Sequence, residues 1–448
     1  MLLQRRKEAR KKVLLPRLVP GPRQKSYFYS VKAGNNSRLV LAALKERPWL
    51  RPQPKGTSPK QQKLFVWEMY RTQSRYANKG LLSNHLEGNG SLVTKKGLHR
   101  TMTTYFGDAT SMPESFHIES TNTDAFRAFQ QTFQAQEEKA KRQQEEPDEE
   151  EAPVAPEKRR RRRRVAEATN VRIVKPASYA NRGFGIRVSN SLDEIATIVE
   201  SEARADARCG GWIVQKYIEE PLLIQGRKFD IRVFVLLVCD DPQRTRTFVH
   251  RKATYLRTSS EPYSLSLDHL KNRFLHLTND GVQKKSPKYG RFEPGNKLTM
   301  DQFQDYMTKT RHLNENYVSD VLQNQIDDLV LKTVEASSHL LNPAHRKNSF
   351  ELLGYDFMLD DDLNVYLIEI NSNPCLDLCC PHLDLNLPLL ISDTLQVGLD
   401  ALLPPPTLQE ATSSDRYRQA IQALQDRHHS FEELFLATNK KEDCPAVE

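Results

Sequence analysis

Oxygen-bearing side chains stand at regular spacing in two strand-like runs near the end of the 448-residue chain. The runs F-E-L-L-G-Y-D-F-M-L and V-Y-L-I-E-I-N flank the polar turn D-D-D-L-N, a pattern typical of a β-hairpin. A four-residue loop would give the cross-strand pairs Asp360–Val365, Met358–Leu367 and Asp356–Glu369. Because side chains alternate along a strand, Asp356, Glu369 and Asn371 would then share one face.

This shared face has the chemistry of a divalent cation site. Two carboxylates directly opposite each other repel, so a positive charge should lie between them. Mg²⁺ prefers oxygen ligands, usually takes one or two carboxylates, and leaves its other positions to water and nucleotide phosphates. The hairpin therefore predicts a Mg²⁺ site formed by Asp356, Glu369 and Asn371. The alternative is a solvated acidic hairpin edge, because Asp and Glu are mostly surface residues.

A lysine and a glycine loop occur together in I-V-K-P-A-S-Y-A-N-R-G-F-G-I-R-V, residues 173–188. A strand that carries Lys175 leads through the loop into a second strand-like segment, which differs from both the P-loop and the dinucleotide-binding turn. Gly183 and Gly185 would let the backbone approach a phosphate closely, and Arg182 would add positive charge. An ordinary hairpin turn is the alternative.

Charged residues also interrupt two apolar runs, W-I-V-Q-K-Y-I and R-K-F-D-I-R-V. Lys216 lies in the first, while Lys228, Asp230 and Arg232 alternate along the second and would share a face. Such charges are costly in a buried strand unless they are paired or line a site, so an ion-paired sheet face is the alternative to a functional site. The run F-L-H-L-T-N-D-G adds three polar residues ahead of a glycine turn, His276, Thr278 and Asn279.

The elements that must position these residues predict an α/β protein. Strand-like and helix-like runs alternate from Val171 to about Leu402, and the N-terminal part begins with a strand followed by a capped helix. Residues 133–164 show no apolar periodicity and separate acidic from basic runs, so we expect a disordered insertion after a helical stem. Its Arg159–Arg164 run is interpreted as a nuclear localisation signal, a docking arm, or a solvated run paired with the preceding acids.

The predicted organisation has six segments. They are a basic disordered tail (1–25), an N-terminal α/β region (26–132), a disordered charged insertion (133–168), a central lobe (169–214), a C-terminal lobe (215–405) and an exposed helical tail (406–448). The first 25 residues contribute +8 of a formal net charge of +9, which indicates an acidic partner. Nucleic acid is not expected, because the basic runs are of low complexity and have no interleaved aromatic residues.

Composition also indicates the cellular compartment of the protein. The chain has no run of the roughly 18 apolar residues that cross a bilayer, so a membrane is not expected. Its six cysteines form no regular framework, which is typical of a reducing compartment. The run C-L-D-L-C-C-P-H has no second ligand pair at a zinc spacing, so we do not expect zinc there. We expect a cytosolic monomer.

The order of these motifs resembles the tubulin tyrosine ligase-like family of ATP-grasp ligases. The resemblance covers most of residues 26–405 apart from the charged insertion, and includes G-N-N-S-R-L-V-L-A-A-L-K-E-R-P-W and L-S-N-H-L-E-G-N-G near the start. It implies an ATP-grasp fold, in which two α/β lobes clamp ATP and Mg²⁺ behind a smaller N-terminal domain. Two positions depart from the family pattern: Phe184 stands where relatives often have Arg or Lys, and Arg172 replaces a usual Trp.

The resemblance also implies a role for each candidate residue. The nucleotide would contact Lys175, Arg182, Gly183, Gly185, Gln215, Lys216, Tyr217, Ile218 and Asn279. The Mg²⁺ ligands would be Asp356, Glu369 and Asn371, and the reacting centre would contain Lys228, Asp230 and Arg232, with Arg232 facing the carboxylate or acyl phosphate.

The implied activity joins a free amino acid to the acidic C-terminal tail of tubulin through an acyl phosphate, on microtubules of the cytoskeleton, a cilium or a flagellum. Glutamate or glycine is expected ahead of tyrosine. An acyl phosphate is needed because a carboxylate is a poor electrophile, and the site must neutralise charge and exclude water. The alternatives are a small-metabolite ATP-grasp ligase and a microtubule-binding protein with a vestigial cleft.

Overall fold

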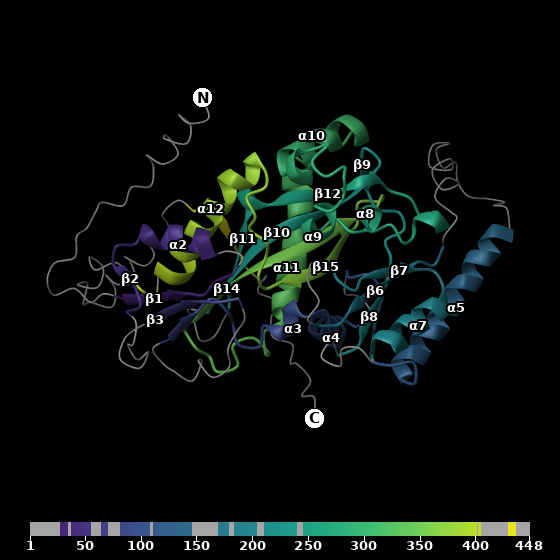
Figure 1. Ribbon diagram of the computed structural model, residues 1–448, viewed down its shortest axis with the longest axis horizontal. Coiled ribbons are helices and arrows are strands. Elements are labelled where there is room, and N and C mark those ends of the chain that lie inside the picture. The colour runs from purple at the N-terminus through teal and green to yellow at the C-terminus, as the bar shows by residue number, and fades with distance from the viewer. Residues whose placement is uncertain are drawn as a thin grey trace.

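The computed structural model describes most of the chain. The described residues are 27–34, 37–54, 64–69, 81–107, 111–145, 169–178, 183–203, 210–239, 245–400, 402–404 and 429–435. Within them two β-sheets of different size are flanked by helices, so the predicted α/β class is confirmed (Figure 1). Among these residues no helix combines the length and the apolar character that a membrane crossing requires.

The larger sheet is built around two long antiparallel strands, β10 (Arg227–Cys239) and β14 (Ser349–Leu359). Every residue of both strands is buried. Its further strands are β1 (Tyr27–Val31), β2 (Leu50–Pro52), β3 (Leu64–Trp67), β4 (Leu81–Ser83), β9 (Leu223–Ile224), β11 (Arg246–His250), β12 (Tyr255–Pro262), β13 (Lys297–Thr299), β15 (Val365–Asn371) and β16 (Phe431–Leu434). The N-terminal strands β1–β4 therefore extend the same sheet that carries the predicted metal hairpin.

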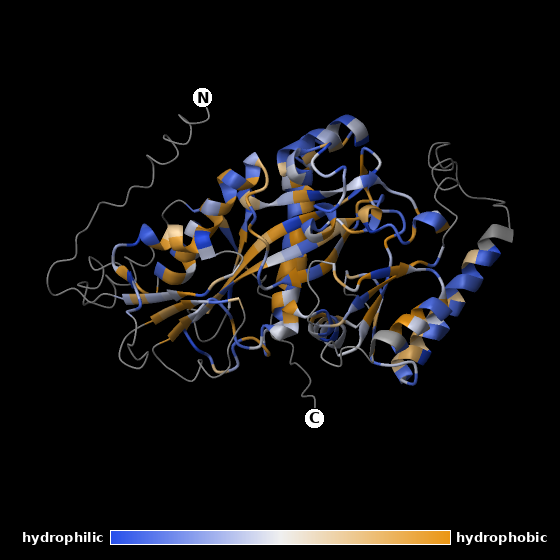
Figure 2. Ribbon diagram, in the orientation of Figure 1, coloured by the Kyte–Doolittle hydropathy of each residue, from blue (hydrophilic) through white to orange (hydrophobic). Residues whose placement is uncertain are grey.

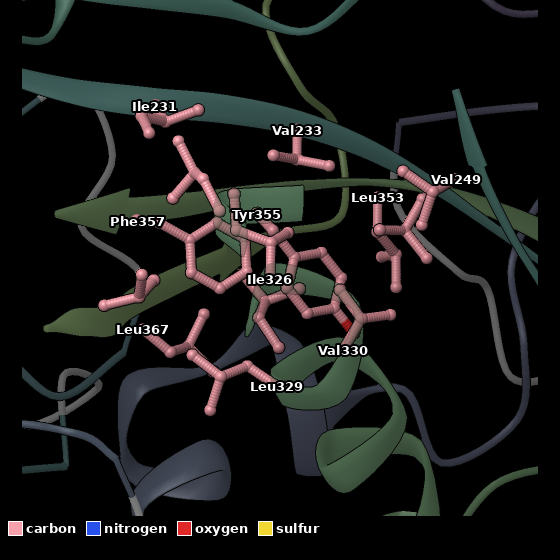
Figure 3. Packing of buried hydrophobic residues seen from close by; sticks show 14 of the residues in the cluster. Ile231, Val233, Val249, Ile326, Leu329, Val330, Leu353, Tyr355, Phe357 and Leu367 are labelled. Carbon is pink, nitrogen blue, oxygen red and sulfur yellow. The ribbon is translucent and has the colours of Figure 1, made fainter. Parts of the chain in front are cut away.

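Helices cover both faces of this sheet, and much of the two central strands is hydrophobic (Figure 2). On one face, α11 (Gln323–Ser337) packs against alternate residues of β10 and β14, among them Val233 and Tyr355 (Figure 3). The Tyr355 hydroxyl lies 2.8 Å from the Thr333 hydroxyl of α11. On the other face, α2 (Ser37–Lys45) and α12 (Pro381–Leu395) cover Phe234 and Leu236.

The second face becomes polar toward the start of β10. The side chains that alternate with the α11-facing residues are apolar at Phe234 and Leu236, and they are charged at Arg232, Asp230 and Lys228. This half of the face lines a cavity instead of packing under α2 and α12. A single strand thus contributes to the core at one end and to the candidate site at the other.

The smaller sheet is antiparallel and contains β5 (Ser115–Ile118), β8 (Trp212–Lys216), β6 (Arg172–Pro176) and β7 (Arg187–Ser189), in that order. Two helices, α5 (Asp124–Glu145) and α7 (Leu192–Ala203), pack on one face through residues such as Phe129 and Ile195. The opposite face, with Lys175 and Gln215, turns toward the larger sheet.

Helix α5 requires a correction to the predicted insertion. Residues 133–145 are helical, and Phe133 is buried against the smaller sheet, so the segment expected to be disordered begins as ordered structure. Residues 146–168, including Arg159–Arg164, lie outside the described part of the chain. Strand β5 and the start of α5, which we assigned to the N-terminal region, belong to the core of the smaller sheet because their apolar residues pack there.

The unusual Arg172 is explained by the same helix. Its side chain is fully buried, donates to Gln136 Oε1 at 2.8 Å, and places its guanidinium carbon 5.3 Å from the centre of the Phe133 ring. An arginine stacked on an aromatic ring keeps its charge at a small cost, since the ring face is negative. Arg172 therefore joins β6 to α5 on the side of the sheet away from the cavity.

The predicted helical tail is also partly wrong. Residues 1–26 and 405–428 lie outside the described residues, but 429–435 contain the strand β16, which pairs with β11. Two ion pairs fasten this strand: Arg246 Nη2 to Glu433 Oε2 at 2.6 Å, and Arg251 Nε to Glu432 Oε2 at 2.7 Å. The partners lie far apart in the sequence, so no local pattern could have revealed the pairing. The remaining α-helices of the described residues are α3 (Gly90–Val93), α4 (Lys95–Phe106), α8 (Arg273–His276), α9 (Asp280–Gln283) and α10 (Met300–Arg311).

Candidate active site

The β14–β15 hairpin forms as predicted, but with a different register near its turn. The observed pairs are Leu359–Val365, Met358–Tyr366, Phe357–Leu367, Asp356–Glu369 and Gly354–Asn371. The predicted pairs Asp360–Val365 and Met358–Leu367 are therefore wrong, whereas Asp356–Glu369 is confirmed. A β-bulge between Asp356 and Phe357 skips Ile368 and restores the register. The two carboxylates consequently face each other, with Asn371 on the same side.

Two arginines hold Asp356 in place. Arg232 lies opposite it on β10 and donates from Nε at 2.5 Å and from Nη2 at 3.0 Å. Arg257 of β12 places Nη2 2.7 Å from Asp356 Oδ2 and also forms two hydrogen bonds with Asp230, one of them at 2.7 Å. All four side chains are buried, and such paired geometry is what makes buried charges tolerable. The predicted positive charge beside the carboxylates is thus supplied in part by the protein itself.

Glu369 faces cations from two other elements. Lys95, the first residue of α4, has its Nζ 3.6 Å from Glu369 Oε2, and Asn371 Nδ2 lies 3.2 Å from Glu369 Oε1. Burial alone would raise the pKa of Glu369, but Lys95, Lys175 and the Asn371 amide outweigh it and lower the pKa to about 2. Glu369 is therefore ionised at every physiological pH.

The oxygen-bearing side chains are close enough to share one cation. Asn371 Nδ2 lies 3.4 Å from Asp356 Oδ2 and 3.2 Å from Glu369 Oε1, so the three groups converge on one point. A half-turn of the Asn371 amide would present its oxygen to that point. Among the described residues no cluster of three His, Cys, Asp or Glu side chains is available as a metal centre, so any ion here would also need water or phosphate ligands. The donor set fits Mg²⁺ in that limited sense.

Lys175 approaches this group from the smaller sheet. Its ammonium is buried and donates to Gln215 Oε1 at 2.7 Å, and Gln215 in turn donates to Ser115 Oγ at 2.9 Å. Burial lowers the pKa of Lys175 to about 8, although Glu369 opposes the shift. A buried lysine with few partners readily gains stability from a phosphate, because the phosphate replaces the hydration that burial removed.

The glycine loop lies across the boundary of the two sheets. Gly183 and Gly185 both adopt a φ of 73°, which favours glycine. A Cβ on Gly183 would lie 2.9 Å from Asn279 Nδ2, and Arg273 donates a hydrogen bond to the Gly183 carbonyl oxygen. Asn279 Oδ1 is buried without a hydrogen-bond partner among the described residues, as expected of a group that awaits a ligand. Arg182 lies outside the described residues.

A hydrogen-bonded chain forms the opposite wall. Lys228 Nζ donates to the Tyr217 hydroxyl at 2.8 Å and lies 4.2 Å from the centre of the Tyr217 ring. The same hydroxyl is 2.9 Å from His276 Nδ1. Burial lowers the pKa of Lys228 to about 7 and that of His276 to about 4, in each case with help from a neighbouring cation, Lys175 and Lys228 respectively. His276 is therefore neutral at physiological pH, whereas Lys228 is poised between its two states.

These side chains surround a cavity of about 520 Å³, a volume typical of small-molecule sites. The predicted residues that line it are Lys175, Gly183, Lys228, Asp230, Arg232, Asn279, Asp356, Glu369 and Asn371. Gln215 lines a smaller adjoining cavity, and Tyr217 lies behind Lys228. The structure does not bring Lys216, Ile218 or Gly185 to the cavity wall. Lys216 lies beside Arg172 on the helix side of the smaller sheet and pairs with Glu219 at 2.6 Å.

Among the site residues missed in the sequence are two cations that contact its carboxylates. Arg257 stands in Y-L-R-T, where period-2 alternation in β12 was the available signal, and Lys95 stands in V-T-K-K-G at the start of α4. Neither pattern is specific, because the contacts of Arg257 with Asp356 and of Lys95 with Glu369 join residues that lie far apart in the sequence. Their presence makes the cavity more cationic than the predicted residues alone suggested.

The chain matches a known protein family over most of its length. Residues 76–411 match the model of the tubulin-tyrosine ligase family, and the chain belongs to that family. The predicted ATP-grasp fold class is thereby confirmed.

Individual relatives are named as glycylases. The chain is 36% identical to tubulin glycylase 3C of Tetrahymena thermophila over 236 residues. This aligned region covers 52% of this chain and 20% of the relative. It is 30% identical over 252 residues to protein polyglycylase TTLL10 of Macaca fascicularis, covering 52% of this chain and 38% of the relative. The Homo sapiens protein named inactive polyglycylase TTLL10 is also 30% identical, with 52% and 35% covered. The chain thus spans less than half of each of these relatives.

Proposed function

We propose that the protein is an ATP- and Mg²⁺-dependent ligase that joins an amino acid to the acidic C-terminal tail of tubulin. Membership of the tubulin-tyrosine ligase family supports a ligase, and the names of the relatives favour glycine as the amino acid. The observation that carries the proposal is that Lys175 from the smaller sheet and Glu369 from the larger sheet face one cavity. Cations and carboxylate oxygens therefore meet where a nucleoside triphosphate with its Mg²⁺ would need both.

The residues around the cavity divide into those that bind, those that orient and those that exclude water. Glu369 and Asn371, with Asp356, would hold Mg²⁺, while Lys175 and Lys228 would neutralise phosphate charge. When bound, MgATP supplies the phosphoryl group that makes a carboxylate reactive toward an amine. Transition states of such transfers are stabilised by fixed cations, because no solvent reorganisation is then needed.

Arg257 and Arg232 would orient the carboxylates of the cavity, a role that adds to the one the family resemblance implies for Arg232. Both Nε and Nη2 of Arg232 are engaged by Asp356, so this guanidinium chiefly fixes the orientation of the carboxylate. Arg257 bridges Asp356 and Asp230 and so ties β10, β12 and β14 together at the cavity floor. The glycine loop, held by Arg273 and seated on Asn279, would cover the phosphates and limit the access of water.

The experiment is incorporation of labelled amino acid into microtubules. The full chain is incubated with ATP, Mg²⁺ and labelled glycine, glutamate or tyrosine, and the tubulin tails are then examined by mass spectrometry. We expect incorporation of glycine or glutamate that requires all components and is lost in Glu369→Gln. Asp362→Asn is the matched control, because Asp362 lies in the turn of the same hairpin and outside the cavity.

The failure of this experiment would be informative in two ways. Product formed without any protein acceptor would identify a small-metabolite ligase. If MgATP binds in calorimetry but no amino acid is incorporated, the proposal is overturned in favour of a non-catalytic microtubule-binding protein. The Homo sapiens relative named inactive is the protein to compare with this chain in that case. Cavity residues that differ between that relative and this chain would then be exchanged.

A further inference from the structure

A second hollow adjoins the 520 Å³ cavity, here called the reacting cavity, on the outer side of the glycine loop. It measures about 570 Å³, and we call it the Phe184 groove. Its lining residues are Phe184, Lys271, Asn272, Arg273, Phe274, Gly281, Val282 and Lys285. Three of these side chains are cationic and none of these lining residues is acidic, while the aromatic rings and Val282 provide an apolar floor.

The tip of the glycine loop exposes an aromatic ring. Phe184 is 78% exposed, although a buried phenylalanine would contribute roughly 2 kcal/mol more to folding. Its neighbours Gly183 and Gly185 both have a φ of 73°, and they sit against Asn279 and Pro176, so the loop cannot simply turn inward. An aromatic residue held in solvent between two anchored glycines is a candidate contact for a partner.

The charges around this ring are suited to an acidic partner. Lys285 is exposed, and Lys271 is 84% exposed with only a 3.5 Å contact to the partly exposed Glu194. Arg273 keeps the loop in place through the Gly183 carbonyl and adds positive charge to the same wall. An extended peptide rich in glutamate could pair its carboxylates with these cations while its side-chain methylenes cover the Phe184 ring.

The groove and the 520 Å³ reacting cavity share a wall. Gly281 lines both hollows, and Gly183, which lines the cavity, directly precedes Phe184. A chain that lies in the groove therefore has a short path past the glycine loop to the cations and carboxylates inside. We propose that the Phe184 groove binds the acidic segment of the acceptor polypeptide that flanks the carboxylate to be modified. This inference rests on the proposed function, whose acceptor it positions.

Binding can be tested without turnover. Fluorescence anisotropy with a fluorescein-labelled oligoglutamate peptide gives an affinity for the full chain, and oligoglutamine of equal length reports binding that does not depend on charge. We expect Lys285→Glu and Phe184→Ser each to weaken oligoglutamate binding by about three- to tenfold. Lys45→Glu, an equal charge change on the exposed side of α2, should leave it unaltered. The salt dependence of binding should be shallower in Lys285→Glu.

A catalytic readout separates docking from nucleotide binding. In the incorporation assay the KM for microtubules should rise in Lys285→Glu, while the calorimetric affinity for MgATP stays at the wild-type value. Circular dichroism and thermal unfolding of each variant establish that it is folded, and Phe184→Ser removes no charge, so the two variants test independent contacts.

Each outcome decides between distinct conclusions. Unchanged oligoglutamate affinity in both variants overturns the proposed peptide binding in the groove and leaves the ligase proposal intact. A second outcome is that the wild-type chain binds oligoglutamate, that the variants bind it more weakly, and that the wild-type chain incorporates no amino acid. This result supports peptide binding in the groove and overturns the ligase proposal. A basic aromatic groove also suits single-stranded nucleic acid, so tighter binding of labelled oligothymidine than of oligoglutamate would overturn the inference in favour of that partner.

Discussion

Arg232 and Asp356 lie directly opposite each other across β10 and β14 and form a buried, two-hydrogen-bond ion pair. Arg257 reaches the same carboxylate from β12, so Asp356 is held by two guanidiniums at the floor of the cavity. This arrangement fixes the orientation of the Asp356 carboxylate relative to Glu369.

Removal of one guanidinium should therefore destabilise the larger sheet. We expect Arg257→Met to lower the free energy of unfolding by about 3 kcal/mol, because Asp230 loses a partner and Asp356 retains one instead of two. Urea denaturation of wild type and variant measures the difference. Lys309→Met is the control: Lys309 and Asp305 are both about three-quarters exposed, so its effect should stay below about 0.5 kcal/mol. Equal effects of the two substitutions would contradict the structural role of Arg257.

Glu369 should govern the binding of Mg²⁺ and nucleotide. Glu369→Gln keeps the shape but removes a charge that Lys95 and Lys175 face, so we expect MgATP affinity to fall by about 10- to 100-fold. Calorimetric titration with MgATP measures the change, and a titration with ATP in excess EDTA separates the metal contribution. Asp362→Asn should bind as wild type does. If Glu369→Gln binds MgATP normally, the carboxylate is not a metal ligand.

Nucleotide affinity should fall as the pH rises from 7 to 9. Burial lowers the pKa of Lys228 to about 7 and that of Lys175 to about 8, so across this range the free protein loses most of the Lys175 charge and the part of the Lys228 charge that remains at pH 7. A bound phosphate favours the charged lysines and raises their pKa values, so MgATP binding at pH 8 should take up protons.

Calorimetry at pH 8 in two buffers of different ionisation enthalpy measures that uptake. The uptake should be smaller in Lys228→Met, since one titrating group is removed. Proton release on binding, or an uptake that Lys228→Met leaves unchanged, would show that these lysines do not face the phosphates.

Gly183 should be more sensitive to substitution than its backbone conformation alone requires. Gly183 and Gly226 have φ values of 73° and 75°, so an alanine at either position costs about 1–2 kcal/mol of backbone strain. Only at Gly183 would the new Cβ collide, 2.9 Å from Asn279 Nδ2, whereas nothing lies within 4 Å at Gly226.

We therefore expect Gly183→Ala to lower MgATP affinity, because either the loop or the Asn279 side chain must shift at the cavity wall. Gly226→Ala should lower thermal stability by a similar amount and leave nucleotide binding intact. The pair of variants, measured by thermal unfolding and calorimetry, isolates the contact from the strain. Identical nucleotide affinities would place the loop outside the binding site.

Local patterns in the sequence determined much of the candidate site. Period-2 alternation on either side of a polar turn correctly predicted that Asp356 and Glu369 oppose each other, and the same rule put Lys228, Asp230 and Arg232 on one face. Such predictions succeed because strand geometry is repeated over a few residues. They missed the bulge that skips Ile368, since a bulge is set by packing across the sheet.

The tertiary structure decided which face of each strand looks into the cavity and which distant residues complete it. Lys175 and Lys216 stand in similar lysine-bearing strands, yet only Lys175 faces the cavity, because α5 and α7 cover the other side of the smaller sheet. Lys95 and Arg257 reach the carboxylates from elements far away in the chain. The sequence by itself determined the hairpin, the charged strand and the glycine loop, whose geometry is local. Burial of apolar faces against particular helices depends on the whole fold. That burial determined which charged side chains reach the cavity and contact one another.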